Sequence, residues 1–241
     1  MNFRKMYLFT LLFLFIGNLS FAQVNKNLPL GEIEVSPFDF GKMWTFENLP
    51  LDYFEKTYGF RPSEEWIESA RMSSLRFASW CSASFVSPSG LIMTNHHCSR
   101  DVVTALQKDG ESFEKNGFVA NGYDLERKAE GLFVEQMVKA IDITAEVKKR
   151  TNAAGTDAEK LELRGKALEA IKEEYSKKKG WNGLRLQAVT FYSGGKFSLY
   201  GYKKYEDIRL VLIPEGDLGY FGGDPDNFTY PRYNLDCTFW R

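Results

Sequence analysis

The sequence has 241 residues, of which 44% are hydrophobic and 26% charged, so the chain can bury a full core as ordinary globular proteins do. This composition excludes an intrinsically disordered chain and a fibrous repeat. Lysine and arginine number 31 against 32 aspartate and glutamate, which gives a formal net charge of -1. No broad basic surface is therefore expected, and the sequence does not predict binding to nucleic acid.

Residues 1–22 have the layout of a secretory signal peptide. Arg4 and Lys5 precede an apolar run, and small residues at the end of the segment suit a signal peptidase that cleaves after Ala22. The run is shorter than the roughly 20 apolar residues that a membrane-spanning helix needs. We therefore expect a periplasmic or secreted protein that leaves the membrane after cleavage and can form disulfides.

The next part of the chain is predicted to pass from an extended arm into a small folded domain. Residues 23–62 read as an N-terminal arm, with a short helix or turn near 49–53. Ser63 precedes two glutamates and an apolar stripe, which predicts a helix over residues 63–73. Residues 83–86 and 91–94 flank a Ser-Pro-Ser-Gly turn, which predicts a β-hairpin.

Further along, strand patterns surround one helical insertion. Residues 157–179 are predicted to form an amphipathic helix capped by Asp157, with an apolar stripe of Leu161, Leu168, Ile171 and Tyr175. The predicted strands are residues 131–140, 184–192, 197–202 and 208–213. The pattern indicates a mostly antiparallel β fold in which residues 63–241 form one domain.

The only two histidines of the chain, His96 and His97, are adjacent, so any histidine chemistry must occur at one place. Three interpretations are open: a metal site, a structural pair, or a general base for an activated nucleophile. Adjacent histidines on a strand point to opposite faces, and no Cys-x-x-Cys or His-x-x-x-His spacing supplies further ligands. The pattern therefore gives little support to a metal.

The three cysteines favour one disulfide in an exported protein. Cys81 and Cys98 flank the predicted hairpin, and a bridge between them would close the loop that carries the histidines. The alternative is two free buried thiols. In either case Cys237 remains as an odd thiol, which we expect to be buried.

Asp236 is a candidate partner for a histidine because it precedes a β-type run near the end of the chain. A general-base imidazole needs an acceptor on its second nitrogen, which fixes the tautomer and stabilises the imidazolium. An aspartate at the start of a strand is more often a turn residue, and Asp224 and Asp226 compete for the same role.

The run from Cys81 to Cys98 resembles the histidine loop of chymotrypsin-like serine peptidases, including its Cys-to-Cys bridge. More closely, the chain is similar to the bacterial periplasmic dipeptidyl-peptidases of the dipeptidyl-peptidase 7 and 11 family. Further matching segments are residues 49–53, 58–60, 205–211 and 222–228. The resemblance extends from about Gly41 to Arg241.

The resemblance implies roles for individual residues. His97 matches the family's general base, Asp236 its triad carboxylate, and Asn227 an asparagine that anchors the free α-amino group of the substrate. His96 has no catalytic role in that pattern. Two departures concern the surroundings of the site: Tyr-Pro-Arg-Tyr at residues 230–233 replaces Trp-Pro-Arg-His, and Cys237 stands where phenylalanine is usual.

The triad order in this family is His, Asp, Ser, and no serine follows Asp236. We therefore expect an N-terminal portion of a longer enzyme, with the first antiparallel β-barrel of a two-barrel, chymotrypsin-like peptidase and without the nucleophile. Such a piece is expected to be inactive and poorly soluble by itself.

The expected partners are peptides with a free N-terminus, with no cofactor and no metal, and the resemblance adds a homodimer for the complete protein. Two interpretations from other classes stay open. One is a catalytically inactive binding module on a peptidase-like barrel, and the other is a periplasmic structural or metal-binding protein.

Overall fold

A computed structural model describes residues 44–220 and 233–241 of the chain. The chain divides into two compact units, and the elements below all belong to the second, Thr45–Arg241. The predicted signal peptide, much of the predicted N-terminal arm, and Asn227 lie outside the described residues.

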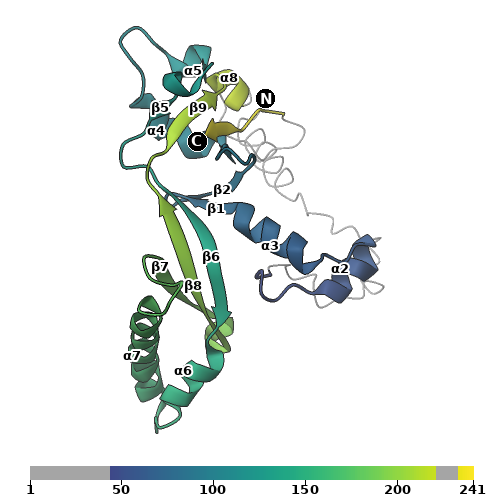
Figure 1. Cartoon of the computed structure of the whole chain (residues 1–241), viewed down its shortest axis with the longest axis vertical. Helices are drawn as coiled ribbons and strands as arrows, with labels where there is room; N and C mark the ends of the chain where they lie inside the picture. The colour runs from purple at the N-terminus through teal and green to yellow at the C-terminus, as the bar shows by residue number, and fades with distance from the viewer. Residues whose placement is uncertain (1–43, 221–232) are drawn as a thin grey trace, which may run out of the picture. The chain divides into compact units, whose positions relative to one another are not determined.

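Ten strands form one antiparallel sheet with the order β4-β9-β10-β3-β2-β1-β6-β8-β7, and β5 pairs with β9 beside this path. The long strands β6 and β8 run side by side in Figure 1. The strands are β1 Ser74–Phe77, β2 Cys81–Phe85, β3 Ile92–Thr94, β4 Phe118–Val119, β5 Arg127–Lys128, β6 Val134–Asp142, β7 Arg185–Phe191, β8 Lys196–Tyr205, β9 Arg209–Ile213 and β10 Thr238–Trp240. No pairing between β4 and β7 closes the sheet among the described residues. The closed barrel that the resemblance implied is therefore not found, although the antiparallel pairing is.

Helices are more numerous than the sequence predicted. They are α2 Leu51–Tyr58, α3 Glu64–Ser73, α4 His96–Thr104, α5 Phe113–Asn116, α6 Thr144–Thr151, α7 Asp157–Ser176 and α8 Gly216–Gly219. Short 3-10 turns occupy Tyr123–Leu125 and Tyr192–Gly194. The fold is therefore mixed α/β rather than mostly β. Several of the short helices were not predicted, because their segments carry no strong helical period.

The predicted helix at 63–73 and the hairpin are confirmed, and local chemistry explains both. The side chain of Ser63 accepts a hydrogen bond from the Trp66 N–H at 3.2 Å, which caps α3. In the hairpin of β2 and β3, Ser87 Oγ accepts from the Leu91 N–H at 3.0 Å. Gly90 lies within this turn and has a φ of 81°, a backbone conformation that favours glycine.

Helix α7 begins one position away from the predicted cap. Thr156, not Asp157, is the N-cap, and it exchanges hydrogen bonds with Glu159 in a capping box. Ile171 is fully buried against α6 and β7, as the stripe predicted, but Leu161 is 63% exposed. The apolar stripe is therefore buried near Ile171 but exposed to solvent at Leu161. The periodicity of the sequence could not indicate which turns of α7 are covered.

Buried side chains form two core clusters, one around strands β1, β3, β6, β9 and β10 and one between α6, α7 and β8. The first contains the largest fully buried side chain. Phe77, Val134, Leu210 and Trp240 are fully buried, and the rings of Phe77 and Trp240 lie 5.7 Å apart. Trp240 belongs to β10, which inserts between β3 and β9 and joins the C-terminal segment to the hairpin. Within the described ranges, no helix has the length and apolarity that crossing a bilayer requires.

Candidate active site

Both histidines lie at the start of helix α4, which corrects the expectation that they lie on a strand. Strand β3 ends at Thr94, Asn95 is the N-cap residue, and the chain turns into the helix at His96. Successive helical residues point about 100° apart, so the two imidazoles still diverge. His96 is buried, whereas the His97 side chain is 40% exposed.

Three contacts hold the first turn of α4 against the sheet. Cys98 forms the predicted disulfide with Cys81 at the start of β2, with the two Cα atoms 6.1 Å apart. Trp80 Nε1 donates to the Cys98 carbonyl at 3.1 Å. On the buried side, Trp240 Nε1 donates to Ser99 Oγ at 3.0 Å. His97 is thus carried on a segment fixed from both sides.

Strand pairing brings Asp236 to this helix. β10 pairs antiparallel with β3 so that Thr238 lies opposite Thr94. Because antiparallel chains run in opposite directions, the residue two positions before Thr238 lies beside the residues that follow Thr94. Asp236 therefore meets His97 although 139 positions separate them in sequence.

The contact is a close hydrogen-bonded pair. His97 Nδ1 and Asp236 Oδ2 are 2.7 Å apart, and the backbone N–H of His97 donates to Oδ1 at 3.1 Å. Asn95 Nδ2 donates to Oδ2 at 3.1 Å. The carboxylate is thus held by three donors from one short segment, with its side chain only 13% exposed.

The environment of Asp236 keeps its carboxyl group ionised. Burial acts to raise its pKa, but the hydrogen bonds from the His97 backbone, the His97 ring and Asn95 outweigh burial and lower the pKa below its ordinary value. An ionised carboxylate can only accept, so Nδ1 of His97 carries the proton and Nε2 is left as the nitrogen that can act as a base. This is the arrangement that a general-base histidine requires.

His96 has a structural environment instead. Its ring packs edge-to-face on Tyr220 with the centroids 5.1 Å apart. A Cβ placed on Gly219 would lie 2.6 Å from this ring, so the contact needs glycine there. Burial lowers the pKa of His96, which keeps the imidazole neutral.

This lowered pKa predicts a pH dependence of stability. Below the ordinary value of 6.5, His96 takes up a proton more readily in the unfolded chain than in the folded one. Stability should therefore fall as the pH drops through that value. In His96→Gln, urea unfolding should show a smaller loss of unfolding free energy between about pH 7.5 and about pH 5. An unchanged dependence would contradict the assignment.

The disulfide should contribute a second measurable part of the stability. Replacing both Cys81 and Cys98 by serine opens a loop with a sequence separation of 17 and is expected to cost about 3 kcal/mol in unfolding free energy. Denaturant titration under oxidising conditions measures this cost. Cys237→Ser is the matched control, because this thiol is free, and it should change stability by less than about 1 kcal/mol.

Metal ligation finds little support in the part of the chain that the structure describes. Cys81, His97 and Cys98 place possible ligand atoms within 4.8 Å of one another. Both sulfur atoms are joined in the disulfide, however, and the thiolate is the form of cysteine that binds metals. The oxidised site therefore offers one imidazole at this place.

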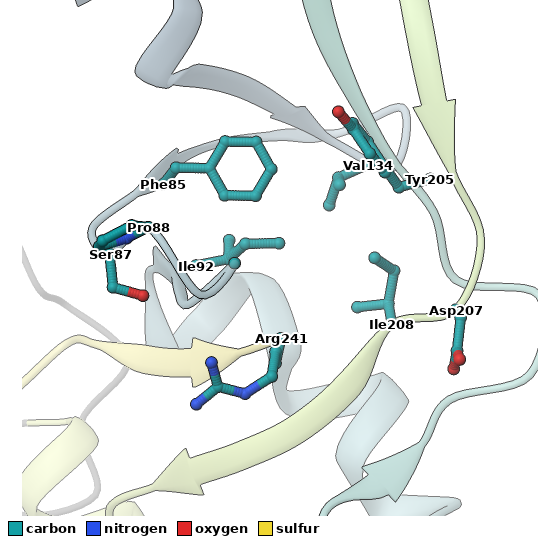
Figure 2. A pocket seen from close by; sticks show the side chains of 10 residues that line it. Phe85, Ser87, Pro88, Ile92, Val134, Tyr205, Asp207, Ile208 and Arg241 are labelled. Carbon is teal, nitrogen blue, oxygen red and sulfur yellow. The ribbon is translucent and has the colours of Figure 1, made fainter. Parts of the chain in front are cut away.

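Two of the cavities in the described part of the chain bear on the site and differ in character. An open groove of about 530 Å³ is lined by His97, Asn95, Trp80 and the disulfide, among other residues. A second cavity of about 400 Å³ is lined mainly by the apolar side chains Phe85, Ile92, Val134 and Ile208, with Asp207 and Arg241 at its edge (Figure 2). Neither residue of the His97–Asp236 pair lines the second cavity, so we place the candidate site in the groove.

The other predicted residues have mixed outcomes. Asn227 and the competing Asp224 and Asp226 lie outside the described residues. Cys237 is only half-buried, which corrects the expectation of a buried thiol. Asn95, which donates to Asp236, was not predicted as a site residue. Its position directly before the two histidines could have indicated it.

Comparison with known proteins identifies a family for this chain. The sequence profile of the family described as Peptidase S46 matches residues 38–241. A protein named dipeptidyl-peptidase 7 from Porphyromonas endodontalis is 28% identical over 83% of this chain, which covers 25% of that relative. An Asp/Glu-specific dipeptidyl-peptidase from Capnocytophaga gingivalis is 33% identical over 77% of this chain, which covers 26% of that relative.

Solved structures of DPP11 from Porphyromonas endodontalis are also similar to this chain. A crystal structure of Porphyromonas endodontalis DPP11 in an alternate conformation matches with a TM-score of 0.67 and 25% identity, over 83% of this chain and 31% of that one. A structure of the same protein in complex with substrate matches with a TM-score of 0.66. The chain thus spans less than a third of the length of these relatives. From the match over most of its sequence, the chain belongs to the peptidase S46 family.

Proposed function

We propose that this chain supplies the general base and the orienting carboxylate of a serine-type dipeptidyl-peptidase. The observation that carries the proposal is the 2.7 Å contact between His97 Nδ1 and Asp236 Oδ2. Membership of the S46 family supports it, since the named relatives are dipeptidyl-peptidases. The nucleophilic serine belongs to sequence outside these 241 residues, in keeping with the small share of each relative that the chain spans.

The proposed reaction is acyl transfer through a covalent intermediate. His97 Nε2 takes the proton from the serine as its oxygen attacks the scissile carbonyl, and Asp236 stabilises the resulting imidazolium. The imidazolium then returns this proton to the leaving amine, which departs and leaves a dipeptidyl ester on the serine. Water then attacks the ester carbonyl as it gives a proton to His97, and the imidazolium returns that proton to the serine oxygen as the dipeptide is released.

The release of dipeptides requires that the substrate's free α-amino group be held two residues from the scissile bond. We propose Asn227 as one of the groups that hold it, because it matches the family's asparagine at this position. Structures of DPP11 in complex with the dipeptides Arg-Glu and Arg-Asp support a dipeptide-sized site in a relative.

Export, barrel closure and dimerisation complete the proposal. Residues 1–22 would direct the chain across the inner membrane, and the Cys81–Cys98 disulfide suits an oxidising compartment. The sheet would close into the first of two barrels when the remaining sequence is present, and the complete protein would form a homodimer.

The test is to express the longest reading frame that contains this sequence beside the 241-residue chain alone. The complete protein should hydrolyse dipeptidyl-methylcoumarinamides with a free N-terminus and leave acetylated ones uncut, and it should react with a fluorophosphonate. The chain alone should do neither. Activity of the chain alone, or no fluorophosphonate labelling of the complete protein, would contradict the proposal and favour an inactive binding module.

A further inference from the structure

A row of charged side chains crosses the sheet beside the candidate site. Arg76 of β1 lies directly opposite Glu135 of β6, and Arg185 of β7 lies opposite Tyr202 of β8. Neighbouring residues on a strand face opposite sides, and Phe77 and Val134, which adjoin Arg76 and Glu135, are in the core. The charged row therefore lies on the face of the sheet away from that core.

The row carries more positive than negative charge. Glu135 is only 3% exposed and accepts from both arginines, from Arg76 Nη1 at 3.3 Å and from Arg185 Nη2 at 2.6 Å. A buried carboxylate needs such partners, but one arginine would neutralise it. Two arginines leave one unit of positive charge in excess.

The two guanidinium groups are also held in place and partly open to solvent. They lie over the ring of Tyr202, 4.8 Å from its centroid for Arg76 and 4.7 Å for Arg185. Their side chains are nevertheless 35% and 41% exposed. Arg76 Nη2 also donates to Gln187 Oε1 at 3.1 Å and to the Tyr202 hydroxyl at 3.4 Å. Of its five N–H donors, the Nε–H and one on Nη1 therefore stay available after Glu135 is satisfied. A fixed, partly exposed guanidinium with such donors is a good receptor for an anion.

Arg76, Glu135 and Tyr202 line the same groove of about 530 Å³ that His97 lines. This volume is in the range of sites that bind small ligands. Since Nδ1 of His97 is occupied by Asp236, Nε2 is the nitrogen that returns the proton to the leaving amine. The leaving part of the substrate therefore starts beside this imidazole, which lines the groove.

We infer that the groove binds the leaving part of the peptide substrate and that Arg76, supported by Arg185, receives a carboxylate from it. The inference rests on the proposed peptidase function. The carboxylate has two sources in peptides, the C-terminus of a short peptide and an acidic side chain. Both present a carboxylate that accepts hydrogen bonds from the remaining guanidinium donors.

The experiment uses the complete enzyme and pentapeptides that share one N-terminal dipeptide. One set ends in a free carboxylate, one in an amide, and one in an amide with aspartate within the leaving tripeptide. The wild-type enzyme should cleave the amide without aspartate with a kcat/KM about tenfold below that of the better carboxylate peptide, mainly through a higher KM. The better peptide identifies the source of the carboxylate.

Arg76→Gln should remove this preference, and Arg76→Lys, which keeps a charge beside Glu135, should retain part of it. Arg209→Gln is the matched control, because Arg209 is similarly exposed, pairs with a single aspartate and does not line the groove. It should leave the preference intact and cleave a dipeptidyl-methylcoumarinamide, whose leaving group is uncharged, within about twofold of the wild-type rate. The peptide preference of each variant is expressed relative to its own rate for this reporter.

The outcomes separate the two proposals. Failure of the wild-type enzyme to cleave the methylcoumarinamide would reject the peptidase function itself. Cleavage of the methylcoumarinamide with equal kcat/KM for carboxylate and amide peptides would reject only the subsite, whether or not the variants fold. A preference that survives Arg76→Gln, or that disappears in Arg209→Gln, would also reject the subsite.

Discussion

His97→Ala in the complete enzyme is expected to lower kcat for a dipeptidyl reporter by about 10⁴-fold or more. The loss is large because the histidine and the serine act as a unit, so that without the base the serine stays protonated. KM should change little, since the imidazole does not hold the substrate in its ground state. Steady-state kinetics on purified protein measure both values.

The adjacent histidine supplies the control for this experiment. His96 is buried against Tyr220 and has no contact with Asp236 among the hydrogen bonds of the described residues. His96→Gln should keep kcat within about tenfold of the wild type while lowering thermal stability. If His97→Ala retained near-normal turnover, or if His96→Gln abolished it, the assignment of the base would be wrong.

Asp236→Asn is expected to lower kcat by about 10⁴-fold at neutral pH. The amide is nearly isosteric, but its NH₂ group can donate to Nδ1, which would move the imidazole proton to Nε2 and remove the base from the serine. The backbone N–H of His97 can still donate to the amide oxygen, so the fold of the site should persist. Circular dichroism and thermal melting check that point.

Asn95→Ala provides a milder companion to this variant. It removes one of the donors to Asp236 Oδ2 and leaves both members of the His97–Asp236 pair in place. We expect a decrease in kcat of about tenfold, the cost of one lost hydrogen bond to a charged group. An Asp236→Asn enzyme that was no slower than Asn95→Ala would contradict the role of the carboxylate.

Local features of the fold were readable from the sequence because their causes are local. The cap of α3 and the turn of the hairpin depend on residues within four positions of each other, such as Ser63 with Trp66 and Ser87 with Leu91. The start of α4 was not readable. The predicted strand ended at Thr94 and no helix was predicted after it. The helix there is held by a disulfide to β2 and by the indole groups of Trp80 and Trp240, which lie in other elements or far along the chain.

The sequence by itself determined the histidine that could act, the cysteine pair that encloses it, and the resemblance that nominated Asp236. Only the tertiary structure decided that this aspartate, rather than a free turn residue, meets the imidazole. The physical reason is the register of β10 on β3, which fixes residues 139 positions apart within hydrogen-bonding distance. The same holds for the arginine pair, since Arg76 and Arg185 share Glu135 only after the four strands β1, β6, β8 and β7 have paired. Such pairings depend on the packing of the whole sheet and leave no periodic mark in the sequence.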